Sequence, residues 1–156
     1  MKTKEDTKEM KNVPLAKKLN DYMVENNKEL YKYLADKGEL KGFLVDRSNA
    51  AFEAYSSAVG AGFPAPDEIS NQILFCGMEN SYREYVESLL EDNFLQFFGK
   101  LNKKPAHLID NIIETIVFAC MGVFYENLGN TYGQVMDKLD DELIKVLEHQ
   151  TKIIML

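Results

Sequence analysis

The sequence predicts an all-α protein, a compact multihelical bundle of five to six helices with a central apolar helix near residues 106–127. Three observations support this prediction. Apolar residues recur at helical spacing along most of the chain, no segment alternates apolar and polar residues over the length of a strand, and glycine or proline separates the periodic segments. The composition, 46% hydrophobic and 28% charged, is that of a globular protein.

The first part of the chain contains three predicted helices. The first covers residues 14–34 and is expected to break into two pieces near 26–27, where two asparagines interrupt the apolar spacing. The second covers residues 43–59, and its inward face carries small side chains that permit close packing. Glycines and prolines between 60 and 66 form a loop, and a short third helix follows over 69–77.

Two capping boxes mark helix starts in the second part of the chain. Ser81 with Glu84 begins a helix that continues to Gly99, and Thr131 with Gln134 begins the final helix. In such a box each side chain satisfies a backbone N–H that would otherwise lack a partner at the helix start. The sequence therefore fixes the beginning of both helices.

Pro105 opens a further helix, which becomes apolar all round, as a helix at the centre of a bundle does. Its longest apolar run, residues 116–125, is shorter than the ~20 residues that cross a bilayer. Cys76 and Cys120 have apolar neighbours, as reduced core thiols do, and the N-terminus lacks a secretory leader. We therefore expect a soluble cytoplasmic protein that does not enter a membrane.

The charge is unevenly distributed. Residues 1–12 are a polar tail that we expect to be mobile, and residues 13–156 are expected to form a single helical domain. Residues 1–47 carry 11 Lys and Arg against 9 Asp and Glu, whereas residues 48–156 carry 7 against 16. Because an acidic surface repels phosphate groups, the folded body is expected to bind no nucleic acid.

The stretch from Arg47 to Phe98 resembles the domain-of-unknown-function family 1896 of Bacteroidetes-type bacteria. The resemblance lies in RSNAAFEAY, a glycine-containing loop, ILFCGM, and the apolar run from Ser81 to Phe94; the segment from Tyr132 to Glu148 is similar to that family's C-terminal helix. The resemblance covers about two thirds of the chain. It implies a multihelical fold, a bacterial cytoplasmic origin and an accessory role near mobile-element genes, and it supplies no catalytic residues.

No catalytic, metal or cofactor motif is recognised. His107 and His149 lie on different predicted helices, and no Glu-x-x-His pair or His-Glu-x-x-His motif is present. Cys76 follows Leu74 and Phe75 near a predicted helix C-terminus and Cys120 lies in the most apolar helix, so we expect core cysteines rather than nucleophiles. The sequence also has no Gly-x-Ser-x-Gly elbow and no phosphate loop. We therefore predict no catalytic residue, no metal and no cofactor.

Arg47 is the candidate ligand-binding residue. It shares the inward face of its predicted helix with small apolar residues, where an unpaired guanidinium would be costly. One interpretation is an ion pair with Glu84 or Glu114 that locks neighbouring helices together. The alternative is a pocket in which Arg47, with Tyr55, receives the carboxylate or phosphate of a small anion.

Apolar residues in excess of one helix face form a candidate interface. They either pack on the body or form a contact surface, since large exposed apolar patches on soluble proteins mark binding sites. The candidate interface residues are Phe94, Leu95, Phe98, Ile153, Ile154 and Leu156.

These observations favour a non-enzymatic helical interaction or accessory protein. Its partner is expected to be a second copy, giving a homodimer, or an unidentified bacterial protein. Small-anion binding at Arg47 is the alternative function. An enzyme with a dispersed site of carboxylates and tyrosines is a third hypothesis, because such a site leaves no local motif.

Overall fold

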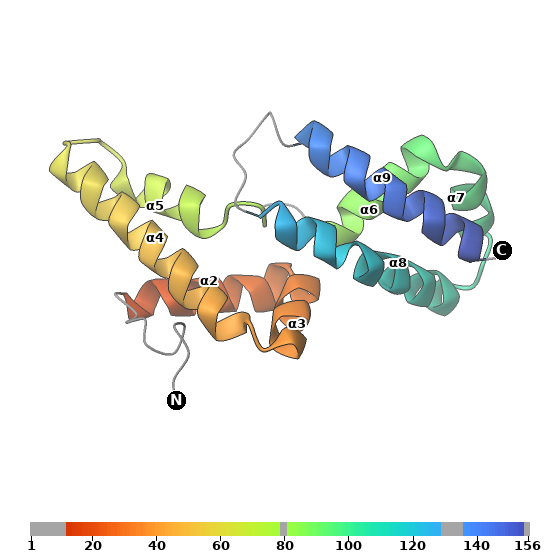
Figure 1. Cartoon of the computed structure of the whole chain (residues 1–156), viewed down its shortest axis with the longest axis horizontal. Helices are drawn as coiled ribbons and strands as arrows, with labels where there is room; N and C mark the ends of the chain where they lie inside the picture. The colour runs from red at the N-terminus through yellow and green to blue at the C-terminus, as the bar shows by residue number, and fades with distance from the viewer. Residues whose placement is uncertain (1–11, 79–80, 129–135, 155–156) are drawn as a thin grey trace. The chain divides into compact units, whose positions relative to one another are not determined.

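A computed structural model of the chain describes residues 12–78, 81–128 and 136–154 (Figure 1). These residues contain eight helices and no strand, so the all-α prediction is confirmed, with more helices than the five to six expected. The contacts within the chain divide it into two compact units, residues 1–76 and 77–156. Each unit is described by itself, and the single domain predicted over residues 13–156 stays a prediction.

The first unit is built on one long helix. This helix, α4, packs against α5 and α2, and α3 contacts both α2 and α4. Its buried residues are Val45, Ser48, Ala51 and Ala58, so small side chains do lie where helices approach closely. The helices of this unit are α2 (Val13–Asn26), α3 (Lys28–Lys37), α4 (Leu40–Gly60) and α5 (Pro66–Leu74).

Asn27 produces the predicted break between the first two helices. Its backbone has φ −146° and ψ 65°, outside the helical region, and its Oδ1 accepts a hydrogen bond from the Leu30 N–H at 3.3 Å. Asn27 therefore ends α2 and caps α3. Asn12 caps α2 in the same way, accepting from the Leu15 N–H at 3.0 Å.

The second unit is built around the apolar helix α8, which packs against α6 and α9 (Figure 1). Its buried face includes Ile113, Ile116, Val117, Cys120 and Phe124. The predicted apolar helix at 106–127 is present, but only this face is buried: Leu108 is 40% and Phe118 64% exposed, so the expectation of a helix buried all round is wrong for this unit. The helices of this unit are α6 (Tyr82–Asn93), α7 (Leu95–Leu101), α8 (Ala106–Glu126) and α9 (Met136–Ile153).

Helix α8 is also long and apolar enough to cross a membrane, by length and composition alone. The sequence prediction had considered only the shorter run at 116–125. Core helices of soluble proteins pass the same test, and α8 packs against two neighbours within its unit. The absence of a membrane segment stays a prediction.

The helix predicted from Ser81 to Gly99 is interrupted at Phe94. That residue has φ −133° and ψ 55°, ends α6 and begins α7. Asn93 contributes to the break, because its Nδ2 donates to the Leu89 carbonyl at 3.1 Å, as side chains that compete with the helical backbone do. The break allows the apolar residues around it to face more than one direction.

Some predicted features lie outside the described residues. These are the polar tail up to residue 11, the second capping box of Thr131 and Gln134, and Leu156 of the candidate interface. The first box lies within the structure, where Ser81 Oγ accepts from the Glu84 N–H at 3.4 Å.

Candidate functional site

A groove lies between the α6–α7 junction and the C-terminal end of α9 in the second unit. Its volume is about 580 Å³. Because α6 and α9 contact each other and α7 follows α6 directly, the groove is held by three helices of one unit. It is lined by Asn93, Phe94, Leu95, Gln96, Phe97, Lys100, Thr151, Lys152 and Ile154.

The apolar part of the groove comes from the break at Phe94. Phe94, Phe97 and Ile154 are partly exposed, and Leu95 is 71% exposed. A leucine so exposed, with other apolar side chains lining the same groove, provides apolar area that a partner would remove from water. Three of the six residues predicted for the interface line this groove, and their role in an interface stays a prediction.

The outcome differs among the predicted interface residues. Phe94, Leu95 and Ile154 are brought together in the groove. Ile153 is 58% exposed on the last turn of α9, and Phe98 is partly exposed on α7, but neither lines the groove. Sequence reasoning missed the polar members of the lining.

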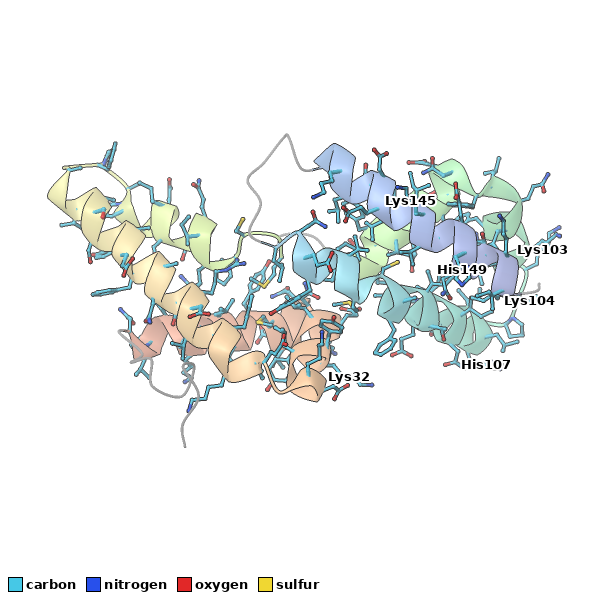
Figure 2. All side chains as sticks on the ribbon, viewed as in Figure 1. Lys32, Lys103, Lys104, His107, Lys145 and His149 are labelled. Atoms are coloured by element: carbon cyan, nitrogen blue, oxygen red, sulfur yellow. The ribbon has the colours of Figure 1, made fainter. Side chains whose placement is uncertain are left out.

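Lys100 and Lys152 give the groove a positive charge. Each lies in the last turn of its helix, α7 and α9 respectively. Within the described part of the chain the groove lining has no carboxylate, and neither lysine forms an ion pair. Figure 2 shows Lys103, Lys104 and His149 at the same end of this unit. The groove is therefore both apolar and basic.

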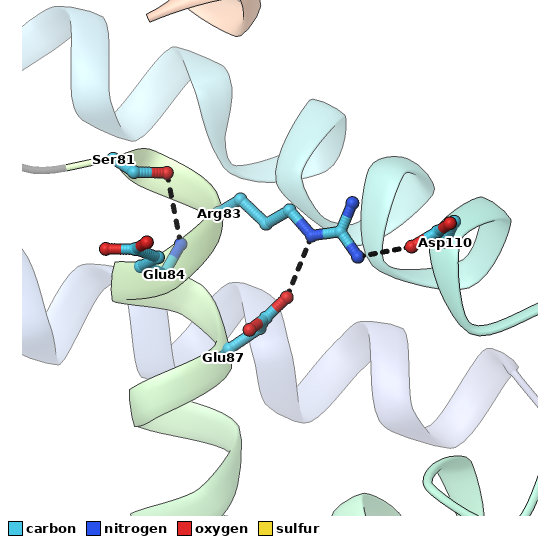
Figure 3. A network of polar contacts seen from close by, with 5 residues as sticks. All are labelled: Ser81, Arg83, Glu84, Glu87 and Asp110. Carbon is cyan, nitrogen blue, oxygen red and sulfur yellow. Dashed lines mark hydrogen bonds and ion pairs between the residues drawn. The ribbon is translucent and has the colours of Figure 1, made fainter. Parts of the chain in front are cut away.

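A polar network joins α6 to α8 in the same unit (Figure 3). Arg83 Nε lies 2.8 Å from Glu87 Oε1, and its Nη2 lies 2.5 Å from Asp110 Oδ1. The hydrogen bond to Asp110, followed by that to Glu87, raises the pKa of Arg83. The spacing of Arg83 and Glu87 by four residues could have indicated their pairing, whereas nothing in the sequence indicated Asp110.

Two further contacts attach α9 to its neighbours. The Tyr85 hydroxyl on α6 donates to Asp140 on α9, and Asn127 Nδ2 lies 3.2 Å from Glu142 Oε2. Burial, and then the hydrogen bond to Asp140, raise the pKa of Tyr85 above its ordinary value. Both causes favour the neutral phenol, so Tyr85 is suited to holding helices together rather than to acting as a base.

Arg47 caps the C-terminal end of α5. Its Nη1 donates to the carbonyl oxygens of Ile73 at 3.2 Å and Cys76 at 2.7 Å, and its guanidinium carbon lies 5.1 Å from the Phe43 ring centroid. The last carbonyls of a helix lack partners within the helix, and a cation there also complements the helix dipole.

These contacts give Nη1 of Arg47 two carbonyl acceptors, and small-anion binding by the guanidinium stays a prediction. The ion pairs proposed for it involved Glu84 and Glu114, which belong to the second unit. Tyr55 is exposed on α4, two turns beyond Arg47, or about 12 Å along the helix axis. The described contacts do not bring Tyr55 to the guanidinium group.

The cysteines and potential metal ligands form no reactive cluster in the described residues. Cys120 is fully buried, and burial raises the pKa of its thiol to about 12, so the prediction of a core cysteine is confirmed. Cys76 is only partly buried. No three His, Cys, Asp or Glu side chains of residues 12–78, 81–128 and 136–154 lie close enough together to hold a metal ion.

The comparisons with known proteins agree with the resemblance seen in the sequence. A family model described as a domain of unknown function (DUF1896) matches residues 15–148, which is most of the chain. No curated protein and no solved structure matches the chain.

Proposed function

The chain belongs to the DUF1896 family, and we propose that it is a non-enzymatic helical interaction protein that binds another protein through the groove of its second unit. We place it in the bacterial cytoplasm, in an accessory role. The family description names no activity, so the proposal rests on the chemistry of the groove.

The exposure of Leu95 carries this proposal. Fully burying a leucine side chain contributes about 1.5–3 kcal/mol, so an isolated protein gains nothing from leaving it 71% exposed. Scattered exposed leucines are common, but this one adjoins Phe94 and Ile154 in a groove. Apolar side chains that line a concave surface are what a partner helix or extended segment contacts.

The state of the shifted ionisable groups supports binding over catalysis. Burial raises the pKa of both Tyr85 and Cys120, which keeps a phenol and a thiol protonated. A tyrosine or cysteine acting as a base or nucleophile needs the opposite, a pKa lowered toward the working pH, so neither of these two groups is suited to that role. Both groups instead serve packing in the second unit.

A second copy of this chain is the other occupant of the groove that the sequence suggested. If two grooves met across a two-fold axis, the lysines of both copies would enter one interface, with no carboxylate from either lining to pair with them. Such like-charge contacts disfavour binding. We therefore propose that the partner is a different protein. Light scattering at micromolar concentration tests the alternative: a homodimer that Leu95→Asp abolishes would show that a second copy of the chain occupies the groove.

Site-specific photocrosslinking in the native bacterium tests the proposed function. A photoreactive amino acid replaces Leu95 in one variant and Val59 in the control, since Val59 is also an exposed apolar residue, 53% exposed on α4 in the first unit. We expect one defined protein adduct from position 95 and not from position 59. The purified partner should then lose binding to the Leu95→Asp variant.

No adduct from position 95 would contradict the proposal. So would a partner that binds wild-type and Leu95→Asp proteins equally well. Because Leu95 is exposed, the aspartate variant should fold normally, and its thermal unfolding midpoint checks that it does.

A further inference from the structure

We propose that the groove selects an acidic and apolar peptide segment of its partner. The segment's carboxylates would lie at Lys100 and Lys152, and a large apolar side chain of the segment would contact Phe94 and Ile154. This inference rests on the proposed function and adds to it the chemistry of the bound segment.

The charge of the groove is opposite to that of its surroundings. Residues 77–156 carry 7 Lys and Arg against 13 Asp and Glu. Four of the seven cations lie in or next to the groove-forming segments, in α7, the α7–α8 connection and the end of α9; they are Lys100, Lys103, Lys104 and Lys152. The other three are Arg83, which is paired with acids on α6 and α8, Lys138, which is paired with Glu142, and Lys145.

Neither Lys100 nor Lys152 forms an ion pair in the described residues, although Glu148 lies one turn before Lys152 on α9 and Glu91 and Asp92 directly precede the lining. Asn93, Gln96 and Thr151 are the other polar residues of the lining, and all three are uncharged. An incoming carboxylate would meet two ammonium groups and several hydrogen-bonding side chains. An incoming lysine or arginine would meet two ammonium groups and no carboxylate among the lining residues, so the groove favours acidic over basic segments.

Screening by salt determines how strongly the net negative charge of the protein repels an acidic peptide. The chain carries a net charge of −7, which by itself repels an acidic partner. At physiological ionic strength the Debye length is about 8 Å, so exposed charges farther away than that are largely screened. A carboxylate bound in the groove therefore interacts with Lys100 and Lys152 and with the few acids close to the lining, and hardly with the rest of the chain.

The apolar side chains limit what kind of acidic ligand fits. Phe94, Leu95, Phe97 and Ile154 line the same groove as the two lysines. Inorganic phosphate or a small dicarboxylate would leave this apolar surface exposed to water. A peptide that places a leucine or aromatic side chain beside its carboxylates would satisfy both parts of the groove.

Selection from a phage-displayed library of random peptides on the purified full chain tests the inference. We expect enriched peptides to combine Asp or Glu with Leu, Ile or an aromatic residue. Affinities of the synthetic peptides, measured by fluorescence anisotropy, should fall roughly fivefold in Lys100→Gln and in Lys152→Gln, which corresponds to about 1 kcal/mol for an exposed ion pair.

Lys138→Gln is the matched control. Lys138 is an exposed lysine of α9 that lies about 21 Å along the helix axis from Lys152, so its loss should leave peptide affinity unchanged. Each lysine of the groove also lies near the negative end of a helix dipole. The unfolding midpoint of each variant therefore separates loss of a binding contact from loss of helix stability.

The outcomes separate this inference from the proposed function. Enriched peptides that lose binding to Leu95→Asp but carry no acids, or that bind both glutamine variants normally, would overturn the acidic preference and leave the interaction function standing. Enrichment of basic peptides would do the same. Selection of no peptide sensitive to Leu95→Asp, or tighter binding of a single-stranded oligonucleotide to the groove lysines, would overturn the peptide inference, whereas the proposed function is overturned by the absence of a protein adduct at position 95.

Discussion

The hydroxyl of Tyr85 on α6 donates a hydrogen bond to Asp140 on α9, and thereby fixes the relation between the two helices whose C-terminal ends form the groove. Tyr85 also meets Phe124 of α8 edge-on, with ring centroids 5.9 Å apart. One side chain of α6 therefore contacts both α8 and α9. We expect the shape of the groove to depend on it.

Replacing Tyr85 by phenylalanine should destabilise the second unit by about 1–2 kcal/mol. The ring stays, but Asp140 loses its hydrogen-bond donor, and bonds to charged groups are the stronger ones. Urea denaturation followed by circular dichroism measures the change. Asp140→Asn is the matched control, because an amide oxygen can still accept from the hydroxyl; an unchanged free energy of unfolding in Tyr85→Phe would contradict the structural role.

Stability should fall as the pH rises through the alkaline range. Burial raises the pKa of Cys120 from 9.0 to about 12 and also raises the pKa of Tyr85, so the unfolded chain releases these protons at lower pH than the folded one. The stabilisation is complete below about pH 9 and is lost above it. Chemical denaturation between pH 8 and pH 11, values chosen to span the ordinary pKa range of these groups at roughly 8.5 to 10, measures the slope.

Cys120→Ala tests the assignment of that slope. The variant should be less stable at neutral pH, since it removes buried atoms, but its stability should depend less on pH between about 9 and 10. An identical slope in the variant and the wild-type protein would show that another group is responsible.

Gly77→Ala should destabilise the second unit by more than about 2 kcal/mol. Gly77 has φ +82°, and a Cβ there would lie 2.9 Å from a side-chain carbon of Leu128 and 3.1 Å from its backbone oxygen. Backbone strain and steric conflict therefore add. Gly62→Ala is the control, because Gly62 has φ +76° but open space around it. Equal losses of thermal stability in the two variants would contradict the close approach of Leu128.

Arg47→Gln should loosen the end of α5. Two carbonyl oxygens, of Ile73 and Cys76, lose a charged donor, which we expect to cost about 1–2 kcal/mol. Amide hydrogen exchange in residues 70–76 should accelerate while exchange in α8 stays unchanged. Unaltered exchange at α5, together with lost affinity for phosphate or acetate, would instead support the anion site first considered for Arg47.

Local signals in the sequence located the break at Asn27 and the start of α6 after Ser81, whereas α4 begins at residue 40 rather than 43 and α5 covers residues 66–74 rather than 69–77. Asn27 and Ser81 act on backbone groups within three residues of themselves, so short motifs were sufficient to locate these helix ends. The break at Phe94 was missed, because apolar residues continue on both sides of it and no glycine or proline marks the position.

Contacts between distant segments were harder to predict. Arg47 donates to the main-chain carbonyl oxygens of Ile73 and Cys76. Because every residue has a main-chain carbonyl, the residue types in the sequence did not identify these acceptors. The sequence did indicate that the apolar residues near Phe94 and Ile154 form one surface. It did not indicate that Lys100 and Lys152 would join them, because that juxtaposition depends on how α9 packs beside α6.

The affinity of the crosslinked partner for wild-type protein and for Leu95→Asp, measured by isothermal titration calorimetry, is the most direct test of the groove as the binding site. Losing the burial of a leucine side chain, about 1.5–3 kcal/mol, should weaken binding at least tenfold. Val59→Asp in the first unit should leave the affinity unchanged. Equal affinities of the wild-type and Leu95→Asp proteins would contradict the account.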